Sequence, residues 1–278
     1  MAVPVLAILA VPLQNMPVFD ANGHGGMVAG WKALLLDLSG VLFDGRRPID
    51  GALDFMRRAR QCGVPLRFVT NTATKPAAAI AGEMRQMGLE VAQDELFTAP
   101  RAAHDYVVAR GLRPFCLVHP AIRAEFDDVP QSDPDCVLLG DARDDLNYRN
   151  LNRAFRLLHD GAPLIGIGLN RYFMDEDGIM LDTGAFIRGL EWAAGIDAVI
   201  MGKPSADFFD LVVADTGQAA ADCLMVGDDV VADVAGAIAA GLQGCLVRTG
   251  KYRAGDEASL PDRATVIDRI GALALPGR

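Results

Sequence analysis

Three carboxylates in the C-terminal half form the densest group of side chains that could do chemistry. Asp228, Asp229 and Asp233 lie within six residues, directly after the apolar run CLMVG. Like charges about 4 Å apart repel by roughly 1 to 4 kcal/mol per pair, depending on the effective dielectric constant, so a cation is expected beside them. Because the group contains only oxygen ligands, Mg²⁺ is favoured. For this motif alone, the alternative is an acidic helix N-terminus that the helix dipole stabilises.

Other polar residues stand at the ends of three further apolar runs. Asp37 ends KALLLD and is followed by Ser39, Thr70 and Asn71 end PLRFVTN, and Lys203 ends AVIMGK. A hydroxyl, an amide and backbone N–H groups suit phosphate oxygens, and a lysine offsets charge that develops on a phosphoryl group. Taken singly, each residue also has a plainer interpretation as a turn residue, a helix N-cap or a solvated lysine.

The apolar runs predict the elements that position these residues. Short runs rich in Val, Ile, Leu and Phe, separated by helical patterns, are typical of buried parallel strands in an α/β sheet. Such strands are expected at 32–37, 65–71, 198–203, 223–229 and 244–247. Helices are expected at 51–61, 75–87, 101–110, 208–215 and 232–240, each followed closely by a glycine that can end it. Ligands bind at the carboxyl ends of such strands, so the motifs should meet at one edge.

The second and third motif-bearing runs are too far apart for a single crossover helix. An inserted domain at 111–195 is therefore predicted, with strands at 114–118, 136–139 and 163–167 and helices at 148–159 and 185–194. The core domain would comprise 31–110 and 196–278, and residues 1–30 would form a poorly ordered extension. Glycines near both crossings, Gly111 and Gly195, would let the insert open and close.

Aspartate, threonine, lysine and paired aspartates, in this order, resemble the motifs of the haloacid dehalogenase superfamily from Trp31 to about Tyr252. The insert resembles the α/β cap, of C2A type, in the class IIA or NagD-like branch. The segments DLSGVL, GKPSADFF and GDDVVADVAGA, followed by RTGKY, look most like the group of phospholysine phosphohistidine inorganic pyrophosphate phosphatases and hydrolase domain-containing protein 2. The resemblance implies a doubly wound, Rossmann-like parallel-sheet core with a cap, and a hydrolase acting on phosphorus-containing bonds.

The resemblance also implies roles for individual residues. Asp37 would attack phosphorus and become an aspartyl phosphate, with Lys203 bridging nucleophile and phosphate. Mg²⁺ would be held by Asp37, the Ser39 carbonyl and Asp228, while Asp229 and Asp233 would order metal-bound waters or the lysine ammonium. The phosphoryl group would be bound by Asp37, Leu38, Ser39, Thr70, Asn71 and Lys203.

Ser39 departs from the family pattern. Most phosphatases of the family carry there a second aspartate that serves as general acid and base, a group whose loss costs about 10² to 10⁴ in rate. Substrates with good leaving groups are therefore expected: a phosphoramidate, pyrophosphate or an activated phosphate ester. In the cap, His119, Asp141, Arg143, Asn170, Arg171 and Tyr172 lie near predicted strand ends. They could touch a leaving group, although solvation at the surface explains each equally well.

Composition limits the partners. The net charge of -10 argues against a nucleic-acid binder, and the apolar segment 2–13 is too short to span a membrane. Five scattered cysteines predict reduced thiols in a cytoplasmic protein. The resemblance adds a possible homodimer. The alternatives to a phosphatase are a non-catalytic phospho-ligand binder and a metal-free dehalogenase, and the Asp228–Asp229 pair speaks against the latter.

Overall fold

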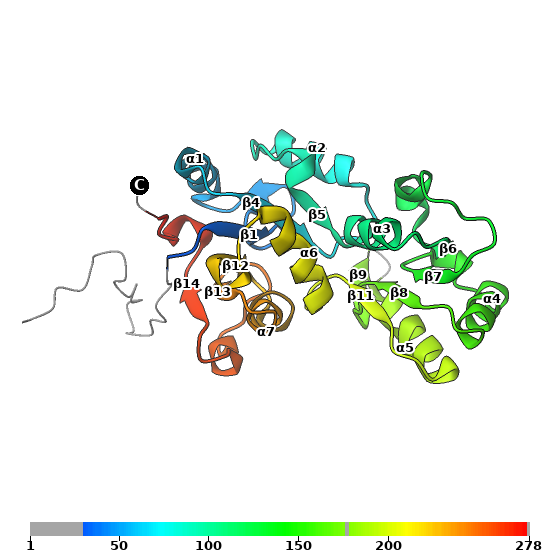
Figure 1. The fold of residues 1–278 in the computed structure, drawn as a ribbon. Coiled ribbons are helices and arrows are strands. Elements are labelled where there is room, and N and C mark those ends of the chain that lie inside the picture. Colours follow the sequence, from blue (N-terminus) through cyan, green and yellow to red (C-terminus); the bar gives the residue numbers. More distant parts are fainter. Residues whose placement is uncertain (1–29, 176–177, 277–278) are drawn as a thin grey trace, which may run out of the picture.

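The computed structural model describes residues 30–175 and 178–276, so the predicted N-terminal extension lies almost wholly outside the described residues. Its largest sheet has six parallel strands in the order β14-β13-β12-β1-β4-β5 (Figure 1). Their bounds are β1 (Ala33–Asp37), β4 (Leu66–Thr70), β5 (Leu96–Thr98), β12 (Cys223–Gly227), β13 (Gln243–Val247) and β14 (Thr265–Ile267). Strand order reverses beside β1, as the prediction of a doubly wound sheet requires.

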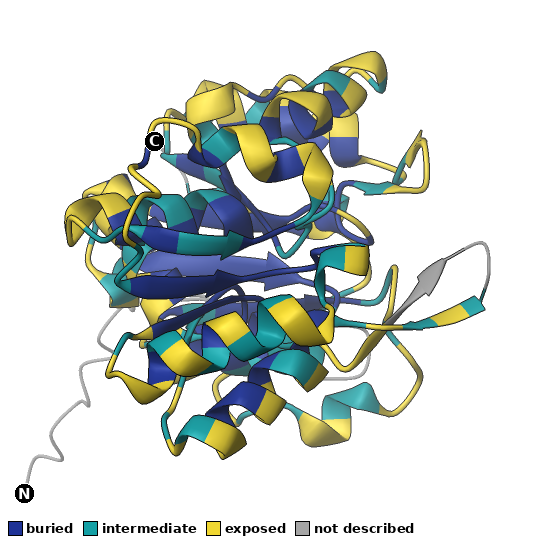
Figure 2. Cartoon of the chain, turned by 90° about the vertical axis from the view of Figure 1, so that its right-hand side faces the viewer, coloured by how far each residue is buried: buried dark blue, intermediate teal, exposed yellow. Residues whose placement is uncertain are grey.

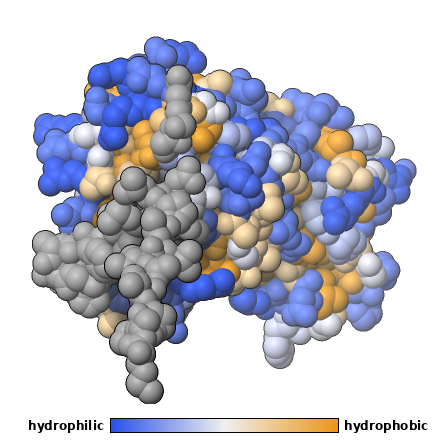
Figure 3. All heavy atoms as spheres, turned by 60° about the vertical axis from the view of Figure 1, so that its left-hand side comes forward, coloured by the Kyte–Doolittle hydropathy of each residue, from blue (hydrophilic) through white to orange (hydrophobic). Residues whose placement is uncertain are grey.

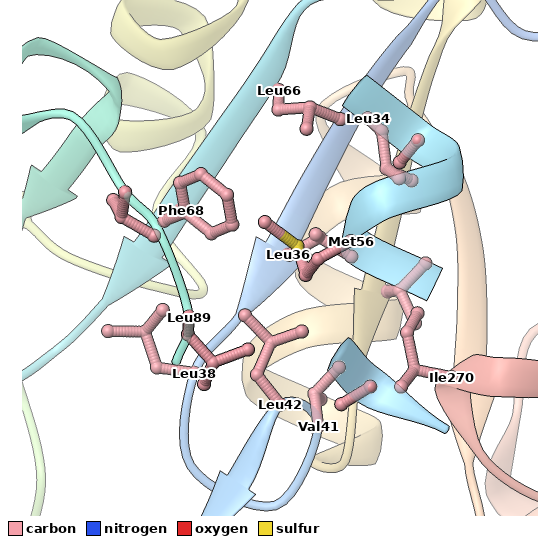
Figure 4. Packing of buried hydrophobic residues seen from close by; sticks show 14 of the residues in the cluster. Leu34, Leu36, Leu38, Val41, Leu42, Met56, Leu66, Phe68, Leu89 and Ile270 are labelled. Carbon is pink, nitrogen blue, oxygen red and sulfur yellow. The ribbon is translucent and has the colours of Figure 1, made fainter. Parts of the chain in front are cut away.

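Helices cover both faces of this sheet because alternate strand residues point to opposite sides. Leu34 and Leu36 pack against α1 (Ala52–Cys62) and α2 (Ala77–Gln86), in the cluster that Figure 4 shows in part. Ala33 and Leu35 pack on the side of α3 (Ala99–Ala109), α6 (Ala206–Thr216) and α7 (Gly236–Ala239). In Figure 2 the sheet is buried between helices whose exposed residues face outward. The glycines predicted to follow the helices, at 63, 88, 111, 217 and 241, all have positive φ.

The insert forms a second parallel sheet in the order β11-β8-β7-β6. Its strands are β6 (Pro114–Leu117), β7 (Cys136–Leu139), β8 (Leu164–Ile167) and β11 (Val199–Met201), and one face carries α4 (Tyr148–His159) and α5 (Thr183–Ala194). Two hairpins pair β2 (Phe43–Asp44) with β3 (Arg47–Pro48), and β9 (Tyr172–Asp175) with β10 (Gly178–Leu181). Short 3₁₀ helices span Gln93–Glu95, Pro120–Phe126, Arg143–Asp145, Ala220–Asp222, Asp256–Ser259 and Ile270–Ala272.

The strand that precedes Lys203 is not where the sequence predicted it. Residues 198–203 were expected to join the core sheet, but β11 pairs with β8 of the insert, with Val199 opposite Ile165. The prediction was wrong because an apolar run shows that a strand is buried and not which sheet buries it. The domain boundaries at 111 and 195 stay a prediction, and β11 continues the second sheet past residue 195.

One hydrophobic cluster joins the two sheets. It contains Leu35 and Val69 from the core sheet and Leu138 and Ile165 from the second sheet, with α3 and α6 packed among them. Within the described residues no helix has the length and apolar composition to cross a membrane. The surface drawn in Figure 3 is mainly hydrophilic, with hydrophobic residues in several separate places.

Candidate active site

A buried lysine between two aspartates forms the centre of the candidate site. Lys203 contacts Asp37 through Nζ and Oδ1, and the same Nζ lies 2.6 Å from Oδ1 of Asp233. The Lys203 side chain is 4% exposed and that of Asp233 is 1% exposed. Since a buried charge needs a partner of opposite sign, the three groups depend on one another. Although β11 belongs to the second sheet, Lys203 thus reaches the carboxyl end of β1.

Burial is the largest single influence on the pKa of Asp37 and on that of Lys203, although for Lys203 the neighbouring carboxylates together outweigh it. It raises the pKa of Asp37 from 3.8 to about 7, with Lys203 opposing the rise and Asp233 and Asp228 adding to it. Burial alone would lower the pKa of Lys203, but Asp233 and Asp37 outweigh it, so that the pKa of this lysine is raised. Lys203 is therefore a permanent cation near neutral pH, whereas Asp37 is only partly ionised without further positive charge.

The carboxylates outnumber the cation that balances them. Oxygens of Asp37, Asp228 and Asp233 lie within 4.8 Å of one another. Asp228 is 3% exposed, and burial raises its pKa, although the backbone N–H of Lys251 acts in the opposite direction. A cluster of oxygen donors with excess negative charge fits a hard divalent cation such as Mg²⁺. Asp37 and Asp228, both predicted as metal ligands, belong to this cluster.

Asp229 and Asp233 take different positions. Oδ1 of Asp229 accepts hydrogen bonds from the N–H groups of Val231 and Ala232, at 3.0 and 2.9 Å, so it caps the following helix. Its other oxygen lies 3.3 Å from Nζ of Lys251, which leaves contact with the Lys203 ammonium to Asp233. The two interpretations of this acidic segment therefore both apply: Asp229 caps a helix N-terminus, and Asp228 and Asp233 belong to the carboxylate cluster that could hold a cation.

The helix that carries Asp233 begins differently from the prediction. Instead of an α-helix over 232–240, a π-helix at Val230–Ala235 precedes α7. Its wider turn lets Oδ2 of Asp233 accept the N–H of Asp229 at 3.1 Å while Oδ1 faces Lys203. Gly227 is needed beside it, because a Cβ there would lie 2.2 Å from the Asp233 side chain.

The side chains predicted to bind phosphate have different contacts in the structure. Oγ1 of Thr70 lies 2.9 Å from Oγ1 of Thr72, at the end of β4. The Asn71 side chain is used within the protein: Oδ1 accepts the N–H of Lys203 and Nδ2 donates to its carbonyl, both at 2.8 Å. The side chain of Leu38 packs in the hydrophobic cluster of Figure 4. Asn71 also lines the cavity, so contact of its remaining amide N–H with a phosphoryl group stays a prediction, whereas Leu38 could contact a phosphoryl group only through its main chain.

A cavity of about 460 Å³ opens above this centre, between the carboxyl edges of the two sheets. Its core side includes Asp37, Thr70, Lys203, Asp233 and Lys251. Its cap side is lined by Asp141, Arg143, Asn170 and Asp182, together with Ile167 and Gly168.

Of the cap residues named from the sequence, some line this cavity and others do not. Asp141, Arg143 and Asn170 line it, and Oδ2 of Asp141 pairs with Nε of Arg143 at 3.2 Å. His119 is not among the lining residues, and its Nδ1 accepts the N–H of Ala121. Two further lining residues were not predicted from the sequence: Asp182, which caps α5, and Lys251, which lies in the RTGKY segment.

Comparisons with known proteins agree with these motifs. Residues 34–130 match a family model described as haloacid dehalogenase-like hydrolase, and residues 200–273 match one described as HAD-hydrolase-like. The phospholysine phosphohistidine inorganic pyrophosphate phosphatase of Xenopus laevis is 42% identical over 235 residues, which are 82% of this chain and 87% of that protein. Haloacid dehalogenase-like hydrolase domain-containing protein 2 of Bos taurus is 40% identical, over 81% of this chain and 87% of that protein.

A solved structure extends the comparison. Glycerol phosphate phosphatase from Mycobacterium tuberculosis, in complex with magnesium, matches with a TM-score of 0.73 and 26% identity. The match covers 86% of this chain and 76% of that one.

Proposed function

Because this chain belongs to the haloacid dehalogenase superfamily of hydrolases, we propose that it is a Mg²⁺-dependent phosphatase of small phosphorylated compounds. The observation that carries the proposal is the buried Asp37–Lys203–Asp233 centre beside Asp228, at the floor of a cavity between two sheet edges. Relatives named as phosphatases and a magnesium-bound structural neighbour support it.

In this proposal Asp37 is the nucleophile. One of its oxygens forms a bond to phosphorus as the bond from phosphorus to the leaving group breaks, which gives an aspartyl phosphate. A water then attacks this intermediate, releasing phosphate and regenerating the carboxylate. Mg²⁺, held by Asp37, Asp228 and the Ser39 carbonyl, would offset the repulsion between carboxylate and phosphate and keep Asp37 ionised. Lys203 adds a fixed cation beside the reacting oxygen, and Asp233 holds that cation in place.

Substrate choice follows from Ser39 and the cap. Ser39 cannot act as a general acid at neutral pH, so the barrier depends on how readily the leaving group departs unaided. Pyrophosphate and aryl phosphates release stable anions, and a phosphoramidate takes a proton from solvent before its P–N bond breaks. Asp141 and Arg143 would contact the leaving group from the cap side of the cavity.

The test is a substrate panel with matched leaving groups. We expect a higher kcat/KM for pyrophosphate, p-nitrophenyl phosphate and a phosphoramidate than for glycerol phosphate, with all turnover lost in EDTA. Acid quenching with labelled pyrophosphate should trap a phosphoenzyme in the unmodified protein and none in Asp37→Asn. Binding without turnover or trapped phosphoenzyme would instead identify a non-catalytic phospho-ligand binder. Halide release from a haloacid without Mg²⁺ would identify a dehalogenase.

Two further expectations belong to this proposal. All five cysteines lie within the described residues as free thiols, which supports a reducing, cytoplasmic location. The predicted homodimer is tested by sedimentation velocity at micromolar concentration, where a single species of monomer mass would contradict it.

A further inference from the structure

The loop Thr249–Lys251, which follows β13, contacts two segments of the proposed metal site. Oγ1 of Thr249 donates a hydrogen bond to the carbonyl of Gly40, although 209 residues separate them. The backbone N–H of Lys251 donates to Oδ2 of Asp228 at 2.8 Å. One short loop therefore touches the turn after the nucleophile and a carboxylate proposed to bind the metal.

Packing around Asp228 leaves no room for a side chain at two positions, Gly250 in this loop and Gly40 in the turn after the nucleophile. Gly40 and Gly250 both have left-handed backbones, with φ of 86° and 65°. A Cβ on Gly40 would lie 1.9 Å from Oδ2 of Asp228, and one on Gly250 would lie 2.1 Å from the same atom. The carboxylate is thus enclosed by two stretches of bare backbone.

The hydrogen bonds also fix a peptide group beside the nucleophile. Gly40 donates its N–H to the carbonyl of Phe43 at 2.7 Å and accepts from Thr249 through its own carbonyl. In a planar trans peptide the N–H of Gly40 and the carbonyl of Ser39 point in opposite directions. Holding Gly40 on both sides therefore sets the direction of the Ser39 carbonyl, a proposed ligand of Mg²⁺.

We propose that residues 249–251 form a positioning clamp that presets the Asp228 carboxylate and the Ser39 carbonyl for the metal. The inference rests on the proposed Mg²⁺ site. Partners that orient metal ligands typically contribute 10- to 100-fold in affinity. The clamp would act through Thr249 and through backbone, so Thr249 is a positioning residue that does not touch the substrate.

The test measures Mg²⁺ affinity directly, by isothermal titration calorimetry on the full chain. Thr249→Val removes the hydroxyl with little change of shape, and we expect its Kd for Mg²⁺ to rise about tenfold or more. Thr249→Ser, which restores the donor, should stay close to the unmodified protein. Thr265→Val is the matched control, because its hydroxyl donates to the carbonyl of Gly244 at 3.3 Å, away from the site. It should change the melting temperature in EDTA and leave the Kd unchanged.

The outcomes separate this inference from the proposed function. No Mg²⁺ binding by the unmodified protein would contradict the metal site itself. Normal binding with an unchanged Kd in Thr249→Val, or an equal rise in Thr265→Val, would overturn the clamp.

If Thr249→Val does not fold, as judged by circular dichroism, two glycine-to-alanine variants provide the test instead. Gly250→Ala would push on Asp228, whereas Gly255→Ala has a comparable positive φ of 100° and no atom within 4 Å of the added Cβ. The clamp predicts that only Gly250→Ala weakens Mg²⁺ binding, and equal affinities would refute it.

Discussion

Replacing the nucleophile should make the metal-free protein more stable. Burial raises the pKa of Asp37 to about 7 in the folded chain, whereas an unfolded chain releases this proton near 3.8. Between these pH values the unfolded state binds fewer protons than the folded state, so stability falls as pH rises and levels off above 7. About three pKa units at ~1.4 kcal/mol each give a penalty of up to about 4 kcal/mol.

Asp37→Asn cannot ionise and escapes this penalty. Its amide oxygen can still accept a hydrogen bond from Lys203, which also keeps its ion pair with Asp233 at 2.6 Å. We expect the variant to gain up to about 4 kcal/mol at pH 8, a figure that already includes the attraction of Lys203 for the ionised carboxylate, and clearly less at pH 5. It should have no turnover at either pH.

The assay is urea denaturation followed by circular dichroism, in EDTA, at pH 5 and pH 8 for both proteins. Saturating Mg²⁺ should reverse the order at pH 8, because binding to the folded state stabilises the unmodified protein more than the variant, which lacks one of the carboxylate ligands. A variant that is less stable than the unmodified protein at pH 8 in EDTA would refute the reasoning. The attraction between Asp37 and Lys203 would then exceed the cost of burying the carboxylate.

Three further predictions concern other groups. Asp228→Ala should raise the Mg²⁺ concentration for half-maximal activity far more than Asp229→Ala. The main effect of Asp229→Ala should be a loss of about 1 kcal/mol of stability from the missing helix cap. Similar activation curves for the two variants would contradict the assignment of metal binding to Asp228 and helix capping to Asp229. Ser39→Asp should raise kcat/KM for glycerol phosphate relative to pyrophosphate by about tenfold or more, and an unchanged ratio would show that no acid is missing. His104→Gln should destabilise more at pH 5.5 than at pH 8.5 in urea unfolding. Burial lowers the pKa of His104, but hydrogen bonds to two aspartates raise it overall, so its contribution is complete below about 6.5 and is lost as pH rises through the raised value. Equal losses at both pH values would contradict the assignment.

The sequence was most informative where strand patterns end in polar residues. Asp37 ends β1 and Asp228 follows β12, and their meeting was expected because the carboxyl ends of parallel strands lie at one edge of a sheet. The meeting with Lys203 also occurs, even though its strand belongs to the other sheet. The sheet to which β11 belongs depends on its pairing with β8, and the residues of a strand do not indicate which distant segment it pairs with.

Finer roles in the site were beyond the sequence. Both Asp229 and Asp233 are aspartates of one short segment, so the sequence does not tell their roles apart. The π-helix places Asp233 against Lys203 and leaves Asp229 to cap the helix. The two hydrogen bonds between the side chain of Asn71 and the backbone of Lys203 join segments that are distant in the chain, so the sequence could not indicate them. Asp182 comes from a loop, where no periodicity indicates which way a side chain points.

The hydrophobic cluster shared by the two sheets has a consequence for cooperativity. Leu35 and Val69 belong to the same cluster as Leu138 and Ile165, with α3 and α6 packed among them, so separating the two sheets would expose apolar surface to water. A hydrogen bond crosses the same junction, since Oε1 of Glu125 in the insert accepts the N–H of Ala77 at the start of α2. Because each part completes the interior of the other, we expect both sheets to unfold in one transition. An insert expressed alone would therefore expose to water the apolar side chains that the core domain covers in the full chain.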